Sequence, residues 1–105
     1  MARRHVKIIN LSGLSKEDQK NVYQGLYKFQ DTHGVSLYEI LLFFKENNYL
    51  IDWVHYINEA ISFGKRIESI RMNILMSIED TDFIPESERE DFENKLNEYL
   101  NVKKL

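Results

Sequence analysis

The sequence predicts an all-α fold: a small bundle of four to five helices, preceded by a short N-terminal extended arm or strand. Only four glycines and one proline interrupt 105 residues, and such sparse punctuation favours helices over many short strands. After Ser15, apolar residues recur mostly at steps of three and four, which is the helical period. The length suits one domain, so we expect an arm over residues 1–14 and a single helical domain over 15–105.

The N-terminal arm has strand character. Val6, Ile8 and Ile9 are β-branched and are followed by Ser12-Gly13, a pattern typical of a short strand. An isolated strand must pair its backbone groups with another segment. The sequence leaves two arrangements open, an ordered tail packed on the helices and a strand paired across a dimer.

A first helix is expected over about residues 15–32. Ser15 and Asp18 form a weak capping box at its start, and Gly34 is a good stop signal after it. The apolar stripe of this helix consists of Val22, Leu26 and Phe29, with Tyr23 and Tyr27 beside it.

The second helix has the clearest start signal in the chain. Ser36 and Glu39 form a capping box directly before an apolar run over residues 37–44. The helix should end near Asn48, because Asn tolerates the left-handed conformation of a helix terminus. Since the run is apolar on more than one face, we expect this helix to be the central, most buried one.

A further helical segment begins at Asp52, which can serve as an N-cap. Gly64 leaves its continuation open: it either separates two helices or lies inside one long helix over about 52–79, at a cost of about 1 kcal/mol. The apolar stripe continues in phase through both parts and comprises Trp53, Tyr56, Ile57, Ala60, Ile61, Ile67, Ile70, Ile74, Leu75 and Ile78.

The last helix is expected over about residues 85–102. Pro85 suits the first turn of a helix, and the carboxylates that follow it interact favourably with the positive end of the helix dipole. The apolar stripe of this helix is Phe92, Leu96, Tyr99 and Leu100.

Composition excludes several classes of site. Cysteine is absent, which excludes a disulfide framework, a zinc-thiolate site, an iron–sulfur cluster and a thiol nucleophile. No apolar run approaches the ~18 residues of a membrane-spanning helix. Arg3 and Arg4 are not followed by an apolar stretch of signal-peptide length, and we expect a cytoplasmic protein. Abundant Asn, Lys, Ile, Glu and Tyr suggest an AT-rich genome, such as that of a low-GC bacterium or its phage.

Catalytic and metal-binding patterns are weak. Asp52, His55 and Glu59 share one helical face, a spacing that suits oxygen and imidazole ligands, but a helix cap with a polar pair is the more common reason for such a pattern. The chain has no Gly-x-Ser-x-Gly motif and no glycine-rich phosphate loop. We therefore expect a protein without enzymatic activity, cofactor or metal.

Charge is divided unevenly along the chain. The stretch from Glu79 to Glu93 contains eight carboxylates and one arginine, whereas Lys and Arg slightly exceed the acids before it. A solvated helix N-terminus explains much of this acidic run. An acidic face that meets a basic partner is the functional alternative.

Thirteen Tyr, Phe and Trp residues are many for a core of this size, and Tyr and Trp are favoured at protein interfaces. We therefore predict a small helical protein that acts by binding another protein, in an accessory, regulatory or inhibitory role, with a homodimer as one form of this. An aromatic face would anchor the partner, and an acidic helix over 86–98 would complement its charge. The predicted protein-binding residues are Tyr38, Tyr49, Trp53, Tyr56, Glu86, Glu88 and Glu90.

The alternative prediction is a small DNA-binding transcriptional regulator. Residues 36–63 read as two helices joined by a short turn, which is the spacing of a helix-turn-helix. The net charge of −3 makes nucleic acid the less favoured partner. The cations available for phosphate contacts would be Arg3, Arg4, Lys65, Arg66 and Arg71.

Overall fold

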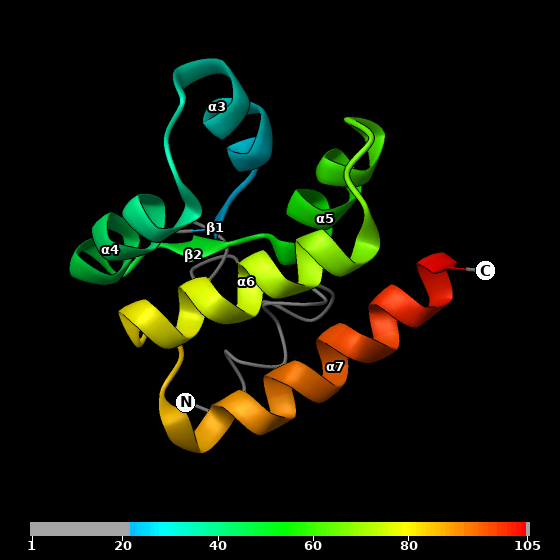
Figure 1. Ribbon diagram of the computed structural model, residues 1–105. Helices are drawn as coiled ribbons and strands as arrows, with labels where there is room; N and C mark the ends of the chain where they lie inside the picture. The colour runs from blue at the N-terminus through cyan, green and yellow to red at the C-terminus, as the bar shows by residue number, and fades with distance from the viewer. Residues whose placement is uncertain (1–21, 105) are drawn as a thin grey trace.

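The computed structural model of the chain describes residues 22–104. Over this range the fold is mostly helical (Figure 1), which confirms the predicted all-α class. The expected strand near residues 5–11, the arm over 1–14 and the helix start at Ser15 lie outside the described residues. The elements are β1 (Val22–Tyr23), α3 (Leu26–His33), α4 (Leu37–Asn47), β2 (Leu50–Ile51), α5 (Trp53–Ser62), α6 (Ile67–Thr81) and α7 (Glu86–Lys104).

The two short strands β1 and β2 form a parallel pair that the sequence did not predict. Val22 lies opposite Leu50 and Tyr23 opposite Ile51. The expected helix over 15–32 is therefore wrong at residues 22–25, and α3 begins only after Gly25. That glycine has a φ of 78°, a left-handed conformation that glycine adopts without steric cost and that turns the chain from β1 into α3.

The face that α3 buries also differs from the expected stripe. Tyr27 is the buried side chain of α3, whereas Phe29 is 46% exposed. The shorter helix starts in a different place and presents a different side to α5, with which it packs. The predicted end at Gly34 is confirmed, because its N–H donates to the carbonyl of Gln30 at 2.8 Å.

Helix α4 has the predicted ends but not the predicted position. The Ser36–Glu39 capping box is present, and Asn48 ends the helix with a left-handed φ of 58°. However, α4 lies at the edge of the fold (Figure 1), and its outward side chain Phe43 is 57% exposed. The central helix is α6, which packs against α4, α5 and α7. The second apolar face of α4 is therefore exposed at the surface and is not buried in the core.

Gly64 separates two helices, which settles the choice that the sequence left open. The Gly64 N–H donates to Ile61 O at 2.9 Å and the Lys65 N–H donates to Ala60 O at 3.1 Å. This pair of hydrogen bonds, with a left-handed glycine, is the Schellman ending of a helix. Gly64 has a φ of 86°, so it is the residue that allows α6 to leave α5 at an angle.

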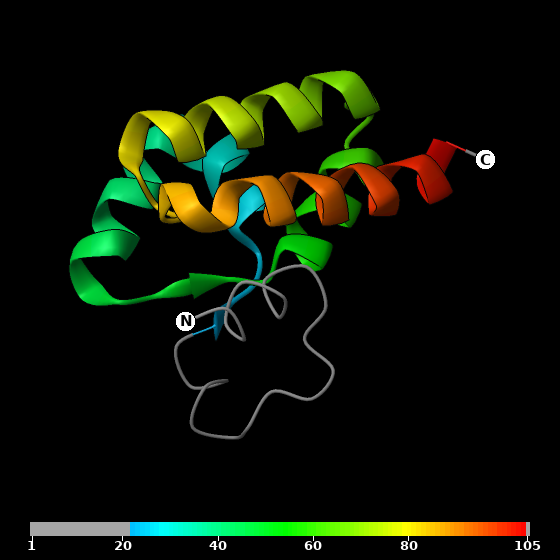
Figure 2. The same ribbon diagram turned by 90° about the horizontal axis from the view of Figure 1, so that it is seen from below.

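Helix α7 confirms the last predicted helix and completes the core. Its inward side chains Phe92, Leu96 and Leu100 are each at most 1% exposed. α7 runs antiparallel to α6 and lies beside it in both ribbon views (Figures 1 and 2). The main apolar contributions from the other helices are Leu37, Leu41, Trp53, Ile57, Ile74 and Ile78.

Candidate functional site

The four aromatic residues predicted to form one binding face do not do so. Trp53 is fully buried and contacts Phe92 edge-on, with ring centroids 5.9 Å apart. Tyr56 is only 3% exposed. Tyr49 is half-buried, and only Tyr38 is exposed, at 44%. Trp53 and Tyr56 are corrected to core residues, because their stripe on α5 faces the other helices.

The three polar residues Asp52, His55 and Glu59 hold α3 in place rather than forming a metal cluster. Asp52 Oδ2 accepts from Gln24 Nε2 at 2.8 Å, and His55 Nδ1 accepts from the Gly25 N–H at 3.2 Å. Glu59 Oε1 accepts from the Lys28 N–H at 3.0 Å. The N-cap residue of α3 gives no side-chain cap, and Glu59 of α5 accepts from a first-turn N–H instead. Within residues 22–104, no group of three potential metal ligands is found.

The cations proposed for DNA binding do not form one free patch within the described range. Arg3 and Arg4 lie outside it. Lys65 and Arg66 are exposed in the α5–α6 turn. Arg71 is engaged elsewhere: its guanidinium lies 3.4 Å from Glu93 Oε2, and its Nε donates to Asn97 Oδ1 at 2.8 Å.

The segment 36–63 does not have helix-turn-helix geometry. Strand β2 separates α4 from α5, and α4 packs chiefly on α6 while α5 packs chiefly on α3. A helix-turn-helix needs two helices packed on each other across a tight turn. The resemblance in spacing therefore does not extend to the fold.

A groove between α6 and α7 combines apolar side chains with carboxylates. Met72, Met76 and Glu79 follow one another at i, i+4 and i+7 on the flank of α6, and the two methionines are 48% and 55% exposed. The groove has a volume of about 180 Å³. Its floor is apolar because buried Ile78 and Phe92 line it. Sequence reasoning missed the two methionines because they stand beside the core stripe rather than on it.

The charged residues that line the groove are Glu79, Glu93 and Arg89. Glu86 and Glu90 do not line it but are exposed on α7. Glu79, Glu86 and Glu90 have no ion-pair partner among the described residues. The predicted residue Glu88 is half-buried, so it contributes less to the exposed surface.

Arg89 is held within this acidic surface by its own neighbours. Its Nε donates to Ile84 O at 2.9 Å, and its guanidinium pairs with Asp82. These contacts fix the turn between α6 and α7 and neutralise Asp82. Of the charged residues that line the groove, Glu79 therefore has no ion-pair partner among the described residues, and its charge is negative.

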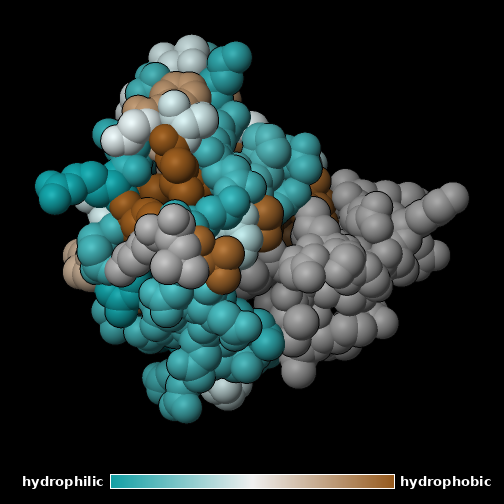
Figure 3. Space-filling view, turned by 90° about the vertical axis from the view of Figure 1, so that its right-hand side faces the viewer, coloured by the Kyte–Doolittle hydropathy of each residue, from teal (hydrophilic) through white to brown (hydrophobic). Residues whose placement is uncertain are grey.

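On the side of the molecule that carries the C-terminal end of α7, most of the described surface is hydrophilic, and apolar atoms are exposed in patches across the middle of the view (Figure 3). Among the described residues, no helix combines the length and apolar character needed to cross a membrane. No protein-family model matches the chain, and searches of curated proteins and of solved structures gave no match either.

Proposed function

We propose that this chain is a small, non-enzymatic helical protein that binds a basic, amphipathic helical segment of another protein in the α6–α7 groove. The observation that carries the proposal is the position of two half-exposed methionines, Met72 and Met76, in a groove lined by Glu79, which has no ion-pair partner among the described residues. An accessory, regulatory or inhibitory role in the cytoplasm of a low-GC bacterium or its phage belongs to this proposal.

The apolar part of the proposed interaction comes from the methionine side chains. Methionine is flexible and polarizable, so it adapts to the side chains of a partner and is common on surfaces that bind amphipathic helices. Met72 and Met76 lie one helical turn apart, which matches the i, i+4 spacing of anchor residues on a partner helix. The groove thus offers two adaptable contacts over an apolar floor.

The charged part of the interaction selects a basic partner. Glu79, Glu86 and Glu90 keep their charges exposed and unpaired within the described residues. Complementary charges around an interface speed association and exclude partners of the wrong sign. A segment with Leu or Ile anchors and flanking Lys or Arg therefore fits the groove better than an acidic one.

The proposal is tested with a synthetic amphipathic Leu/Lys helical peptide and a Leu/Glu peptide of the same pattern. The chain has three methionines, so isotope labelling of methionine methyl groups gives a simple NMR spectrum in which two signals report on the groove. We expect the Leu/Lys peptide to shift the Met72 and Met76 signals in a saturable way that weakens as salt rises. The Leu/Glu peptide should bind far less well.

A matched pair of variants locates the binding surface. Met72→Gln with Met76→Gln should weaken binding of the Leu/Lys peptide about tenfold or more, since the two apolar side chains that the peptide would cover are lost. Leu42→Gln with Phe43→Gln removes exposed apolar side chains from α4 and should leave the affinity unchanged. Equal binding of both peptides, or a loss caused by the α4 pair instead, contradicts the proposal.

Two alternatives to a basic protein partner, a second copy of the chain and duplex DNA, are each tested with a pair of variants. If sedimentation shows a homodimer that Met72→Gln with Met76→Gln dissociates, a second copy occupies the groove and the proposal of a basic partner is wrong. If the protein binds duplex DNA and Lys65→Glu with Arg66→Glu abolishes that binding, the DNA-binding alternative replaces it.

A further inference from the structure

We propose that a cleft between α3, α5 and α6 binds a small zwitterion, a molecule that has a carboxylate, an ammonium group and an apolar body, such as an amino acid or a short peptide. The cleft shares no lining residue with the α6–α7 groove, so this site goes beyond the proposed function and stands independently of it.

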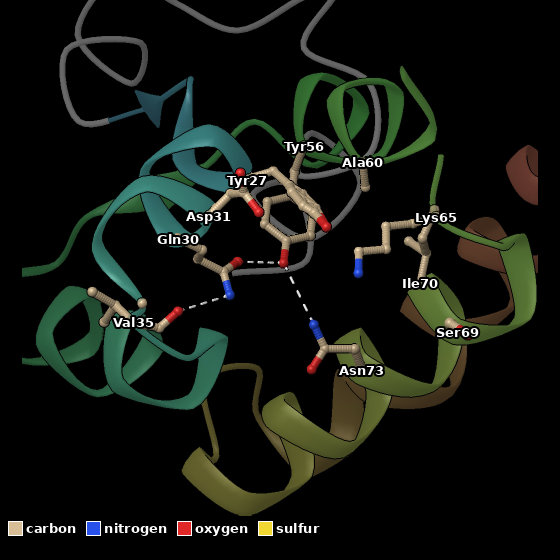
Figure 4. Close-up of a pocket in the computed structure, with 11 residues that line it drawn as sticks. Tyr27, Gln30, Asp31, Val35, Tyr56, Ala60, Lys65, Ser69, Ile70 and Asn73 are labelled. Atoms are coloured by element: carbon tan, nitrogen blue, oxygen red, sulfur yellow. Dashed lines mark hydrogen bonds between the residues drawn. The ribbon is translucent and has the colours of Figure 1, made fainter. Parts of the chain in front are cut away.

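The cleft is large enough for a small ligand and is backed by the core. Its volume is about 370 Å³, which is within the range of small-molecule sites, ~300–1,000 Å³. The back wall consists of side chains that are almost fully buried, Tyr27, Tyr56, Ala60 and Ile70. Figure 4 shows polar groups from three different elements directed toward the same space.

The wall of the cleft is held by a hydrogen-bonded set of side chains. The Tyr56 hydroxyl donates to Gln30 Oε1 at 2.5 Å, and Gln30 Nε2 donates to Val35 O at 3.2 Å. Burial raises the pKa of Tyr56, so the phenol stays neutral and acts as a fixed polar wall. These contacts leave Tyr56 and Gln30 in position before any ligand enters, which lowers the cost of binding.

The Asn73 side chain makes weaker hydrogen bonds than the Gln30 side chain. Its Nδ2 lies 3.5 Å from the Tyr56 hydroxyl, a length at which a hydrogen bond contributes little. No other hydrogen bond of the Asn73 side chain is found among the described residues. Asn73 therefore has both a carbonyl oxygen and amide protons free to meet a polar ligand.

The charged residues of the cleft point to a ligand with two charges. Lys65 and Asp31 both line the cleft, and neither forms an ion pair with the other or with another described residue. Lys65 extends into the cleft from the α5–α6 turn, while Asp31 stands on the α3 side (Figure 4). A carboxylate on the ligand can meet Lys65 and an ammonium can meet Asp31, whereas a ligand with a single charge meets only one of them.

The test compares three probes with the same carbon chain: ε-aminocaproate, which has both charges, caproate, which has only the carboxylate, and hexylamine, which has only the ammonium. Backbone NMR shifts at Ser69 and Asn73 report on binding in the cleft. Because Lys65 and Asp31 are both exposed, each ion pair adds little to the affinity. We expect the affinity of ε-aminocaproate to be at least about threefold higher than that of either analogue.

Two charge-neutralising variants show which residue of the cleft meets which charge of the probe. Lys65→Gln should remove the advantage of ε-aminocaproate over hexylamine, and Asp31→Asn should remove its advantage over caproate. Lys28→Gln and Asp80→Asn neutralise exposed charges outside the cleft and should change neither ratio. The inference is overturned if no probe gives saturable shifts at Ser69 and Asn73, if the three probes bind equally, or if the control variants act like the cleft variants.

Discussion

At the scale of single residues, Asp52 illustrates how one buried side chain serves two elements. Its Oδ1 accepts from the His55 N–H at 3.0 Å and so caps α5, while its Oδ2 accepts from Gln24 Nε2 at 2.8 Å. The residue is only 5% exposed. Loss of the Asp52 side chain would remove the N-cap of α5 and one of the contacts that orient α3. A cap alone contributes about 1 kcal/mol to stability.

We therefore expect Asp52→Ala to lower the free energy of unfolding by about 1–3 kcal/mol, measured by urea denaturation. Asp80→Ala removes an exposed carboxylate on α6 and should change stability by less than about 0.5 kcal/mol. An Asp52→Ala variant as stable as the Asp80→Ala variant would show that the two hydrogen bonds contribute nothing measurable.

Ionisation of Tyr56 makes the stability of the fold depend on pH in the alkaline range. Burial raises its pKa in the folded protein, so the unfolded chain releases this proton first, near the ordinary tyrosine value of about 10. Stability from this group is complete below pH 10 and is lost as the pH rises above it, by up to about 1.4 kcal/mol per pH unit. Tyr56→Phe should show a shallower loss of stability between pH 10 and 11 in urea titrations. Parallel curves for the two proteins would contradict this.

At the scale of elements, the break between α5 and α6 depends on the left-handed backbone of Gly64. A Cβ at this position would meet nothing within 4 Å, so a substitution tests the backbone conformation alone. Gly64→Ala should destabilise the protein by about 1–2 kcal/mol, measured by urea denaturation. Gly64→Asn should cost less, because Asn tolerates this conformation. Equal losses for Ala and Asn would point to a cause other than the backbone.

The elements that could be predicted from the sequence are those with local signals. Ser36 and Glu39 cap α4 through their own side chains, and α7 has a regular apolar stripe. The strand pair could not be predicted, because Val22 and Leu50 belong to two-residue strands that exist only through pairing with each other. The position of α4 in the fold could not be predicted either, since its apolar run does not show which of its faces packs against α6.

At the scale of the whole molecule, α6 organises both candidate sites. Met72 and Met76 face the groove shared with α7, whereas Ser69 and Asn73 line the cleft shared with α3 and α5. The acidic part of the groove could be predicted from the charge run. The cleft could not, because Asp31, Lys65 and Asn73 come together only when three helices pack.

The parallel pairing of β1 with β2 has a consequence for the order of folding. Val22 and Leu50 are register partners, and joining them encloses the whole of α3 and α4 in one loop, which costs chain entropy before any contact is gained. The antiparallel α6–α7 hairpin closes through only a short turn, so its contacts are local in sequence. We expect the C-terminal hairpin to form early in refolding and the β1–α3 segment to dock last, onto a nucleus that already contains α6.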